Sequence, residues 1–289
     1  MSAQHSEPDN APGFKAIRWN MDWVTRPLFG IALAALAIYA LTRDAPLYFA
    51  LLMALVGLPA AYEWHRMVAR KQVFRLETAI TAASVALAVL SLALGASVAV
   101  ALVLVALGAI AAMLLAVRQG NVPGWEGLGV VYLGLPSIAL VSLRAFPPQG
   151  AIVIIGLFVI VWATDTGALI CGNLIGGPRL SPRLSPAKTW AGTLGGSLIA
   201  AAAFAGFVYY LHGSPQPAFV LGLGLSVTAH AGDLFESFLK RRFGIKNSGA
   251  IIPGHGGVLD RMDSTLAAAL VLALLVFGFH LDPLFGAHA

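Results

Sequence analysis

Residues 232–263 read GDLFESFLKRRFGIKNSGAIIPGHGGVLDRMD, and they concentrate charge in a chain that is 58% hydrophobic and only 11% charged. Apolar runs of helical length flank this stretch, which predicts a polar loop between two membrane helices. Topology alone explains basic residues in such a loop, but not acids at both flanking helix ends or the turn Gly254-His255-Gly256-Gly257. Carboxylates hold divalent cations, basic side chains hold phosphates, and glycines let backbone N–H groups approach an anion. The stretch therefore predicts a functional site.

The composition predicts a polytopic membrane protein. A mean hydropathy of +0.83 excludes a soluble globular domain. The basic residues are spread over short loops instead of forming one patch, which argues against nucleic acid as a partner. The single cysteine, Cys171, excludes an internal disulfide.

Apolar segments of helical length recur along the whole chain and predict about nine transmembrane helices. If the N-terminus is cytoplasmic, 16 of the 18 Lys and Arg residues fall on the inner side, and only Arg43 and Arg144 fall outside. We therefore expect an all-α integral membrane protein with a cytoplasmic N-terminus and its polar chemistry facing the cytoplasm. The candidate spans are 27–42, 45–63, 76–94, 96–117, 126–143, 149–172, 190–211, 216–238 and 262–281.

The chain divides by the character of its segments. Residues 1–26 are expected to form a cytoplasmic tail with an interfacial segment, and residues 27–145 a transmembrane scaffold rich in Ala, Leu and Val. Residues 146–289 are expected to form the catalytic transmembrane region, with two cytoplasmic loops. Within the scaffold, Glu63-Trp64-His65 lies where the second span leaves the membrane, and a position at the membrane interface is favoured over a functional role for Glu63.

Four acids, Asp165, Asp233, Asp260 and Asp263, are expected to meet at one depth. Asp165 lies inside the sixth span, where an ionisable residue costs roughly 2.5–3.5 kcal/mol unless it faces a polar cavity or a partner. Asp233 and Glu236 are three residues apart at the end of the eighth span, and Asp260 and Asp263 have the same spacing at the start of the ninth. Carboxylates this close repel unless a cation neutralises them, and Mg²⁺, with a possible second cation, is the expected one.

Basic residues and hydroxyls near these acids suit phosphate binding. Ser185, Lys188 and Thr189 lie in the loop before the seventh span, which two Ser-Pro pairs stiffen. Pairing of the acids with Lys240, Arg241 and Arg261 is an alternative that would account for one or two carboxylates. His255 suits either a general base or a hydrogen-bonded loop residue.

These motifs resemble those of the phosphatidate cytidylyltransferase family. The resemblance rests on residues 237–241, Lys246 and 253–263, and on Asp165-Thr166-Gly167-Ala168 and Ser185-Pro186-Ala187-Lys188-Thr189 upstream. It implies a polytopic enzyme of the bacterial inner membrane, often a homodimer, that makes CDP-diacylglycerol and pyrophosphate from CTP and phosphatidate with Mg²⁺.

The expected roles follow from this resemblance and from the charges. The expected metal ligands are Asp165, Asp233, Asp260 and Asp263. The expected catalytic residues are Lys188, Lys240, Arg241, His255 and Asp260. The expected substrate-binding residues are Ser185, Lys188, Thr189, Arg241, Lys246, Gly256, Gly257 and Arg261.

The chain departs from the family pattern at three positions. Asn247 and Ala191 stand where the family usually has Asp and Glu, and Leu169 stands where Tyr is common. An active enzyme is favoured because the carboxylates of the sixth, eighth and ninth spans remain. The alternatives are a divergent homologue with altered or lost activity, a phosphotransferase acting on polyprenyl phosphate, and a secondary transporter, whose acids would usually lie near the midplane.

Overall fold

The computed structural model describes residues 32, 34–69, 75–249, 251 and 256–281. The predicted N-terminal tail and interfacial segment, the start of the first candidate span and His255 lie outside these residues. Residues 34–42 of the first span are helical.

The described residues contain eight helices long and apolar enough to cross a membrane. They confirm the all-α polytopic fold and match the predicted spans from the second onward, although α2 and α8 run further into the charged segments. The cytoplasmic position of the N-terminus stays a prediction. The helices are α2 (Leu47–Ala69), α3 (Leu76–Ala93), α4 (Val98–Arg118), α5 (Pro123–Ala145), α6 (Gly150–Leu174), α7 (Trp190–Tyr210), α8 (Pro215–Arg242) and α9 (Leu259–Ala273), which continues into the π-helical turn η1 (Leu274–Gly278).

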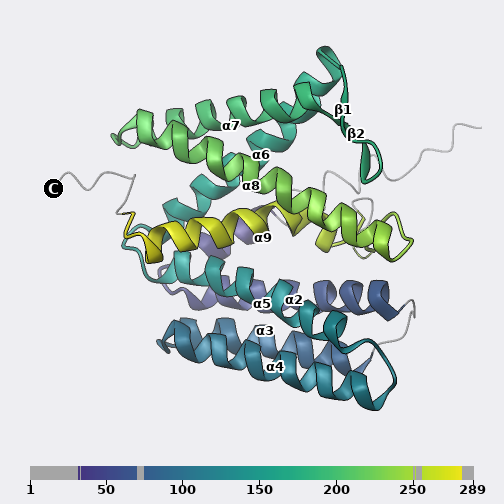
Figure 1. Cartoon of the computed structure of the whole chain (residues 1–289). Helices are drawn as coiled ribbons and strands as arrows, with labels where there is room; N and C mark the ends of the chain where they lie inside the picture. Colours follow the sequence, from purple (N-terminus) through teal and green to yellow (C-terminus); the bar gives the residue numbers. More distant parts are fainter. Residues whose placement is uncertain (1–31, 33, 70–74, 250, 252–255, 282–289) are drawn as a thin grey trace, which may run out of the picture.

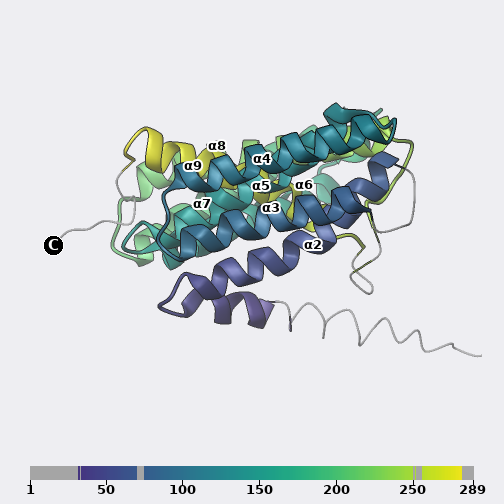
Figure 2. The ribbon, with the colours of Figure 1, turned by 90° about the horizontal axis from the view of Figure 1, so that it is seen from below.

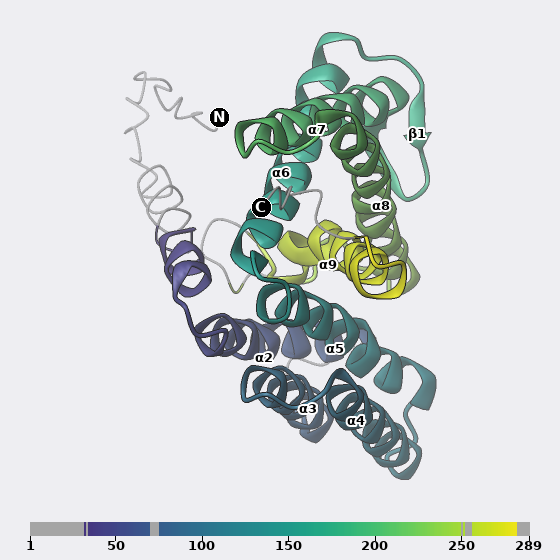
Figure 3. The same cartoon turned by 90° about the vertical axis from the view of Figure 1, so that its left-hand side faces the viewer.

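The helices run along one common direction and fall into two groups with α9 between them (Figures 2 and 3). Helices α2 to α5 pack on one side of α9, and α6 to α8 pack on the other. Glycines allow close contact between α6 and α7: a Cβ at Gly196 would lie 2.7 Å from the carbonyl oxygen of Thr164, and one at Gly192 would lie 2.8 Å from that of Ala168. This is the small-residue packing typical of membrane helices.

The loop between α6 and α7, which the sequence predicted to be rigid, forms a short antiparallel hairpin. Strand β1 (Arg179–Ser181) pairs with β2 (Ser185–Thr189), and β2 leads directly into α7. Thr189 caps that helix, because its hydroxyl oxygen accepts a hydrogen bond from the Gly192 amide at 3.0 Å. The hairpin, the end of α8 and the start of α9 lie at the same end of the bundle (Figure 1).

Glu63-Trp64-His65 is packed inside the protein instead of being exposed, as an interfacial anchor would be. The exposed fractions of these side chains are 0%, 0% and 1%. The Trp64 indole donates to the carbonyl oxygen of Trp125 at 3.0 Å, and His65 hydrogen-bonds to Glu126 and to the Thr81 hydroxyl. The partners come from α3 and α5, so helix packing buries a segment that looks like an interfacial anchor when it is considered alone.

Candidate active site

The site begins where α8 and α9 come closest. A Cβ at Gly232 would lie 2.6 Å from the Ala267 Cβ and 2.7 Å from the carbonyl oxygen of Asp263, so only glycine fits there without a shift. This approach places the next turn of α8 against the first turns of α9. Glu236, which is 1% exposed, consequently contacts Asp263, which is 8% exposed.

Two lysines partner the acids of these helices. The Lys240 ammonium lies 2.7 Å from an Asp260 carboxylate oxygen and 3.4 Å from a Glu236 oxygen. Lys188, at the end of β2, forms an ion pair with Asp233. Pairing with a basic residue was the alternative explanation for one or two of the acids, and Lys240 provides such a pair for Asp260. The pair between Lys188 and Asp233 joins the hairpin to α8.

Asp260 also organises the loop that precedes it. Its carboxylate accepts hydrogen bonds from the Ser248 amide at 3.2 Å and from the Gly257 amide at 3.4 Å. Gly256 has φ +87°, which favours glycine, and a Cβ at Gly257 would lie 2.0 Å from the Ser248 hydroxyl oxygen. The two predicted substrate-binding glycines therefore let the loop close onto Asp260.

Glu63 of α2 holds the other side of this loop. One of its oxygens accepts from the Leu259 amide at 2.9 Å and from the Ser248 hydroxyl at 3.2 Å. It thereby takes the place of an N-cap for α9, whose own N-cap residue, Val258, has no capping side chain. The guanidinium of Arg66, three residues later in α2, donates to the Ser248 carbonyl oxygen at 3.0 Å. Helix α2, which lies in the region predicted to be scaffold, thus fixes the position of the loop.

The remaining predicted residues surround this centre. Asp165 of α6 is exposed, and its charged neighbours are Asp233, Lys188 and Arg261. Arg241 donates to the carbonyl oxygens of Leu184, at 3.3 Å, and Ile245, at 3.4 Å, so it bridges the hairpin and the loop.

The exposure of the other predicted phosphate-binding residues differs. Ser185 is partly buried where it pairs with Ser181 in the hairpin, whereas Lys246 and Arg261 are exposed. Thr189 is buried at the start of α7. The roles of these residues in binding substrate stay predictions.

The donor set suits Mg²⁺, although it is not arranged around one ion. Within the described ranges no three His, Cys, Asp or Glu side chains are grouped as ligands of a single metal. Both carboxylate oxygens of Glu236 are nevertheless buried and accept no hydrogen bond from the described residues. Carboxylate oxygens are the donors that Mg²⁺ prefers, and the Lys240 ammonium, 3.4 Å from one Glu236 oxygen, leaves this buried carboxylate with coordination capacity for a further cation. The residues therefore fit the metal that the sequence predicts.

The fold and the site together define a polytopic membrane protein whose acids and lysines meet at one end of the helical bundle, the arrangement expected of an enzyme for phosphorylated substrates. The chain belongs to the cytidylyltransferase family, whose profile matches residues 24–279.

Two relatives illustrate the similarity, and both are named phosphatidate cytidylyltransferase. The one from Brucella suis biovar 1 (strain 1330) is 38% identical over 258 residues, covering 86% of this chain and 92% of the relative. The one from Rickettsia bellii (strain RML369-C) is 35% identical over 153 residues, covering 50% of this chain and 66% of the relative.

Two residues of the site were missed or undervalued by sequence reasoning. Glu236 was recognised as a neighbour of Asp233, but its buried contact with Asp263 was not foreseen. Glu63 was assigned to the interface, although it binds the loop before α9. The available signal for Glu63 was an acid at the end of an apolar span. Its partner Leu259 is 196 residues away, and no local sequence pattern predicts the contact between them.

Proposed function

We propose that this chain transfers the cytidylyl group of CTP to phosphatidate, giving CDP-diacylglycerol and pyrophosphate. The observation that carries the proposal is the similarity to a phosphatidate cytidylyltransferase over 86% of the chain. The geometry supports it, because acids and lysines from α8, α9 and the hairpin gather at one end of the bundle. A lipid headgroup at the membrane surface and a soluble nucleotide would both have access there.

In the proposed reaction, an oxygen of the phosphatidate phosphate attacks the α-phosphorus of CTP. The bond from that phosphorus to the bridging oxygen of the β-phosphate breaks, and the electron pair leaves with pyrophosphate. Both reactants are strongly anionic, so catalysis consists mainly of holding them together and neutralising their charge.

Lys188 and Lys240 are the cations best placed for this task. Each now neutralises an aspartate, and each would turn toward phosphate oxygens when substrates arrive. An ammonium on a flexible stem can change partners in this way. Arg241, exposed between the hairpin and the loop, would bind the lipid phosphate or the departing pyrophosphate through its remaining N–H groups.

The carboxylates are proposed to hold Mg²⁺, which when bound would neutralise oxygens of the triphosphate. Asp233, Asp260 and Asp263 are the proposed ligands, with Glu236 as the carboxylate that the structure adds. Asp165 faces the same charges from α6 and is proposed as an additional ligand or a support for one.

The protein is proposed to lie in the bacterial inner membrane with this site facing the cytoplasm. The support is the charge distribution: Arg66, Arg118 and the basic residues of the hairpin and of the end of α8 share one end of the bundle, whereas Arg144 closes α5 at the other end. Such a bias places the basic end in the cytoplasm. Association as a homodimer, which the resemblance implies, stays a prediction.

The proposal is tested with purified protein in detergent, phosphatidate and CTP radiolabelled at the α-phosphorus. We expect the label to enter a chloroform-soluble lipid only when phosphatidate and Mg²⁺ are both present. Polyprenyl phosphate replaces phosphatidate in a parallel reaction. Labelling of that lipid instead of phosphatidate, or no labelling of either, contradicts the proposal.

A further inference from the structure

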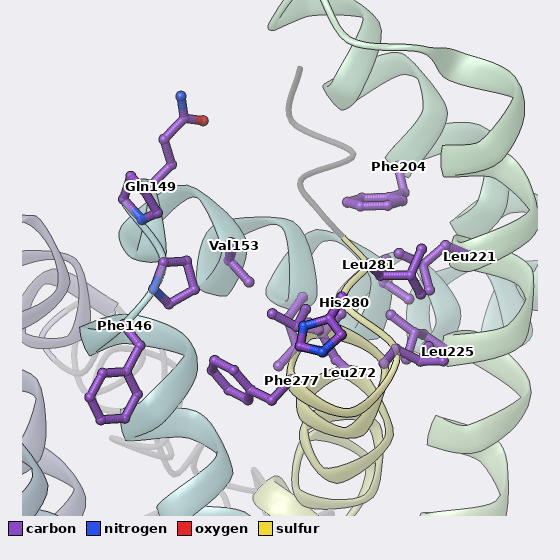
Figure 4. Close-up of a pocket in the computed structure, with 16 residues that line it drawn as sticks. Phe146, Gln149, Val153, Phe204, Leu221, Leu225, Leu272, Phe277, His280 and Leu281 are labelled. Carbon is purple, nitrogen blue, oxygen red and sulfur yellow. The ribbon is translucent and has the colours of Figure 1, made fainter. Parts of the chain in front are cut away.

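A cavity of about 500 Å³ lies between helices α6, α7, α8 and α9, at the end of the bundle opposite the acids (Figure 4). Protein interiors rarely contain voids larger than a water molecule, whereas ligand pockets measure roughly 300–1,000 Å³. Of the described residues that line it, only Gln149 and His280 have polar side chains. A dry space of this size and chemistry suits an aliphatic ligand.

The inner end of the cavity is closed. Leu157, Ile160 and Leu225 line it and are each 1% exposed. Next to them, toward the acids, lies a buried hydrogen-bonded layer: the Thr164 hydroxyl donates to the Ser226 oxygen at 2.8 Å, and the Ser226 hydroxyl donates to Ser197 at 3.1 Å. This polar layer separates the cavity from the proposed active site.

The mouth of the cavity opens near the start of α6 and the end of η1, away from the acids. Phe146, Phe277 and Leu281 line it and are exposed. The turn η1 and the residues after it shape the rim: His280 has φ 46°, a left-handed conformation, and the Leu281 amide folds back to donate to the Leu275 carbonyl oxygen at 3.2 Å. His280 consequently lies between the walls formed by α6 and α8 (Figure 4).

The depth of the cavity corresponds to one leaflet of the bilayer. From Gln149 at the rim to Ile160 at the floor, α6 rises roughly 16 Å at about 1.5 Å per residue. Half of a hydrocarbon core of about 30 Å is close to this length. The exposed Tyr209 and Tyr210 at the end of α7 mark the interface at the same end of the bundle.

We propose that this cavity binds one acyl chain of a bilayer phospholipid from the leaflet opposite the active site. The acyl chain lies along α6 among the leucines that line the cavity, and the lipid headgroup stays at the rim beside His280. The bound lipid is a second lipid, distinct from the substrate, because the polar layer closes the cavity toward the acids. The site does not depend on the reaction proposed above.

The test uses the full chain reconstituted in phosphatidylcholine vesicles that contain phosphatidylcholine with a diazirine near the end of one acyl chain. After illumination we expect labelled peptides containing Leu225 or Leu272. Leu221→Trp fills the cavity and should reduce this labelling at least fivefold. Val220→Trp is the matched control, because Val220 is 69% exposed on the same helix and does not line the cavity.

Three results overturn the proposal. They are the absence of label at the floor, equal labelling in the two tryptophan variants, and a much larger loss of label with excess phosphatidate than with the same excess of unlabelled phosphatidylcholine, which would make the cavity part of the substrate site. Leu221→Phe, a smaller increase in volume, replaces the tryptophan variant if that protein does not fold. CDP-lipid formation by each variant serves as the check of folding, and its absence in wild type would affect only the proposed function.

Discussion

Glu63 provides the sharpest test of how the site is held together. The change is Glu63→Ala, which removes the carboxylate that binds the loop before α9. It leaves two buried donors, the Leu259 amide and the Ser248 hydroxyl, without an acceptor. Each unsatisfied donor costs about 1–3 kcal/mol, so the loop loses about 2–6 kcal/mol in its present position.

That loss should appear as reduced turnover. If the loop relaxes to recover these hydrogen bonds, the fraction of molecules with Asp260 in its present position falls. Each 1.36 kcal/mol lost by the loop in this position lowers that fraction by about a factor of ten. We expect CDP-lipid formation by Glu63→Ala to fall at least about tenfold and to need more Mg²⁺ for half-maximal rate. Glu63→Gln retains an acceptor oxygen and should recover most of the activity.

Glu77→Ala is the matched control, because Glu77 is also 0% exposed but pairs with Arg75, outside the loop. Both alanine variants should unfold at lower temperature in detergent. Only Glu63→Ala should lose turnover per folded molecule. Equal turnover in the two variants, or no recovery in Glu63→Gln, would show that Glu63 supports the fold and not the position of Asp260.

Three further predictions concern the acids, the departures from the family pattern and the topology. Asp260→Asn and Asp263→Asn should each lower CDP-lipid formation about a hundredfold, the upper range for loss of a metal ligand or its support; near-wild-type turnover at saturating Mg²⁺ removes the residue from the site. Ala191→Glu should raise the free energy of unfolding by about 0.3–1 kcal/mol, because an acid at the start of α7 interacts favourably with the helix dipole. Asn247→Asp should leave the Mg²⁺ requirement unchanged. A tenfold shift in the Mg²⁺ concentration for half-maximal rate in either variant contradicts this expectation. In a cysteine-free variant, a maleimide that does not cross membranes should label a cysteine at position 212 in intact cells and spare one at 247, and the reverse pattern refutes the orientation.

The membrane helices could be predicted closely, because their signal is local. An uninterrupted apolar run of sufficient length specifies a span without reference to the rest of the chain. Helix α7 was placed within one residue of its observed bounds, Trp190–Tyr210. The acids of α8 and α9 were also predictable, since their spacing along each helix fixes which side chains share a face.

The contacts between these elements could not be predicted. The partners of Glu63, Trp64 and His65 lie in other helices, and a sequence pattern shows an amphipathic segment without showing what covers it. The pairing of Lys188 with Asp233 depends on the hairpin register, in which Arg179 faces Thr189, and two Ser-Pro pairs do not specify that register. The sequence therefore identified the charged groups and offered Lys240 as a partner for an acid, but it did not show which acid each lysine pairs with.

The contact between Glu63 and Leu259 has a consequence for biosynthesis. The two residues are 196 positions apart, so α2 enters the membrane long before its partner is made. Until α9 emerges, the Glu63 carboxylate has neither the loop nor the helix end that it binds in the finished protein, and a carboxylate alone in hydrocarbon is unfavourable. Insertion of the final helix then supplies these donors at the same moment as it delivers Asp260 and Asp263. Stable burial of an early acid and completion of the reactive centre are thus a single late event in the assembly of the chain.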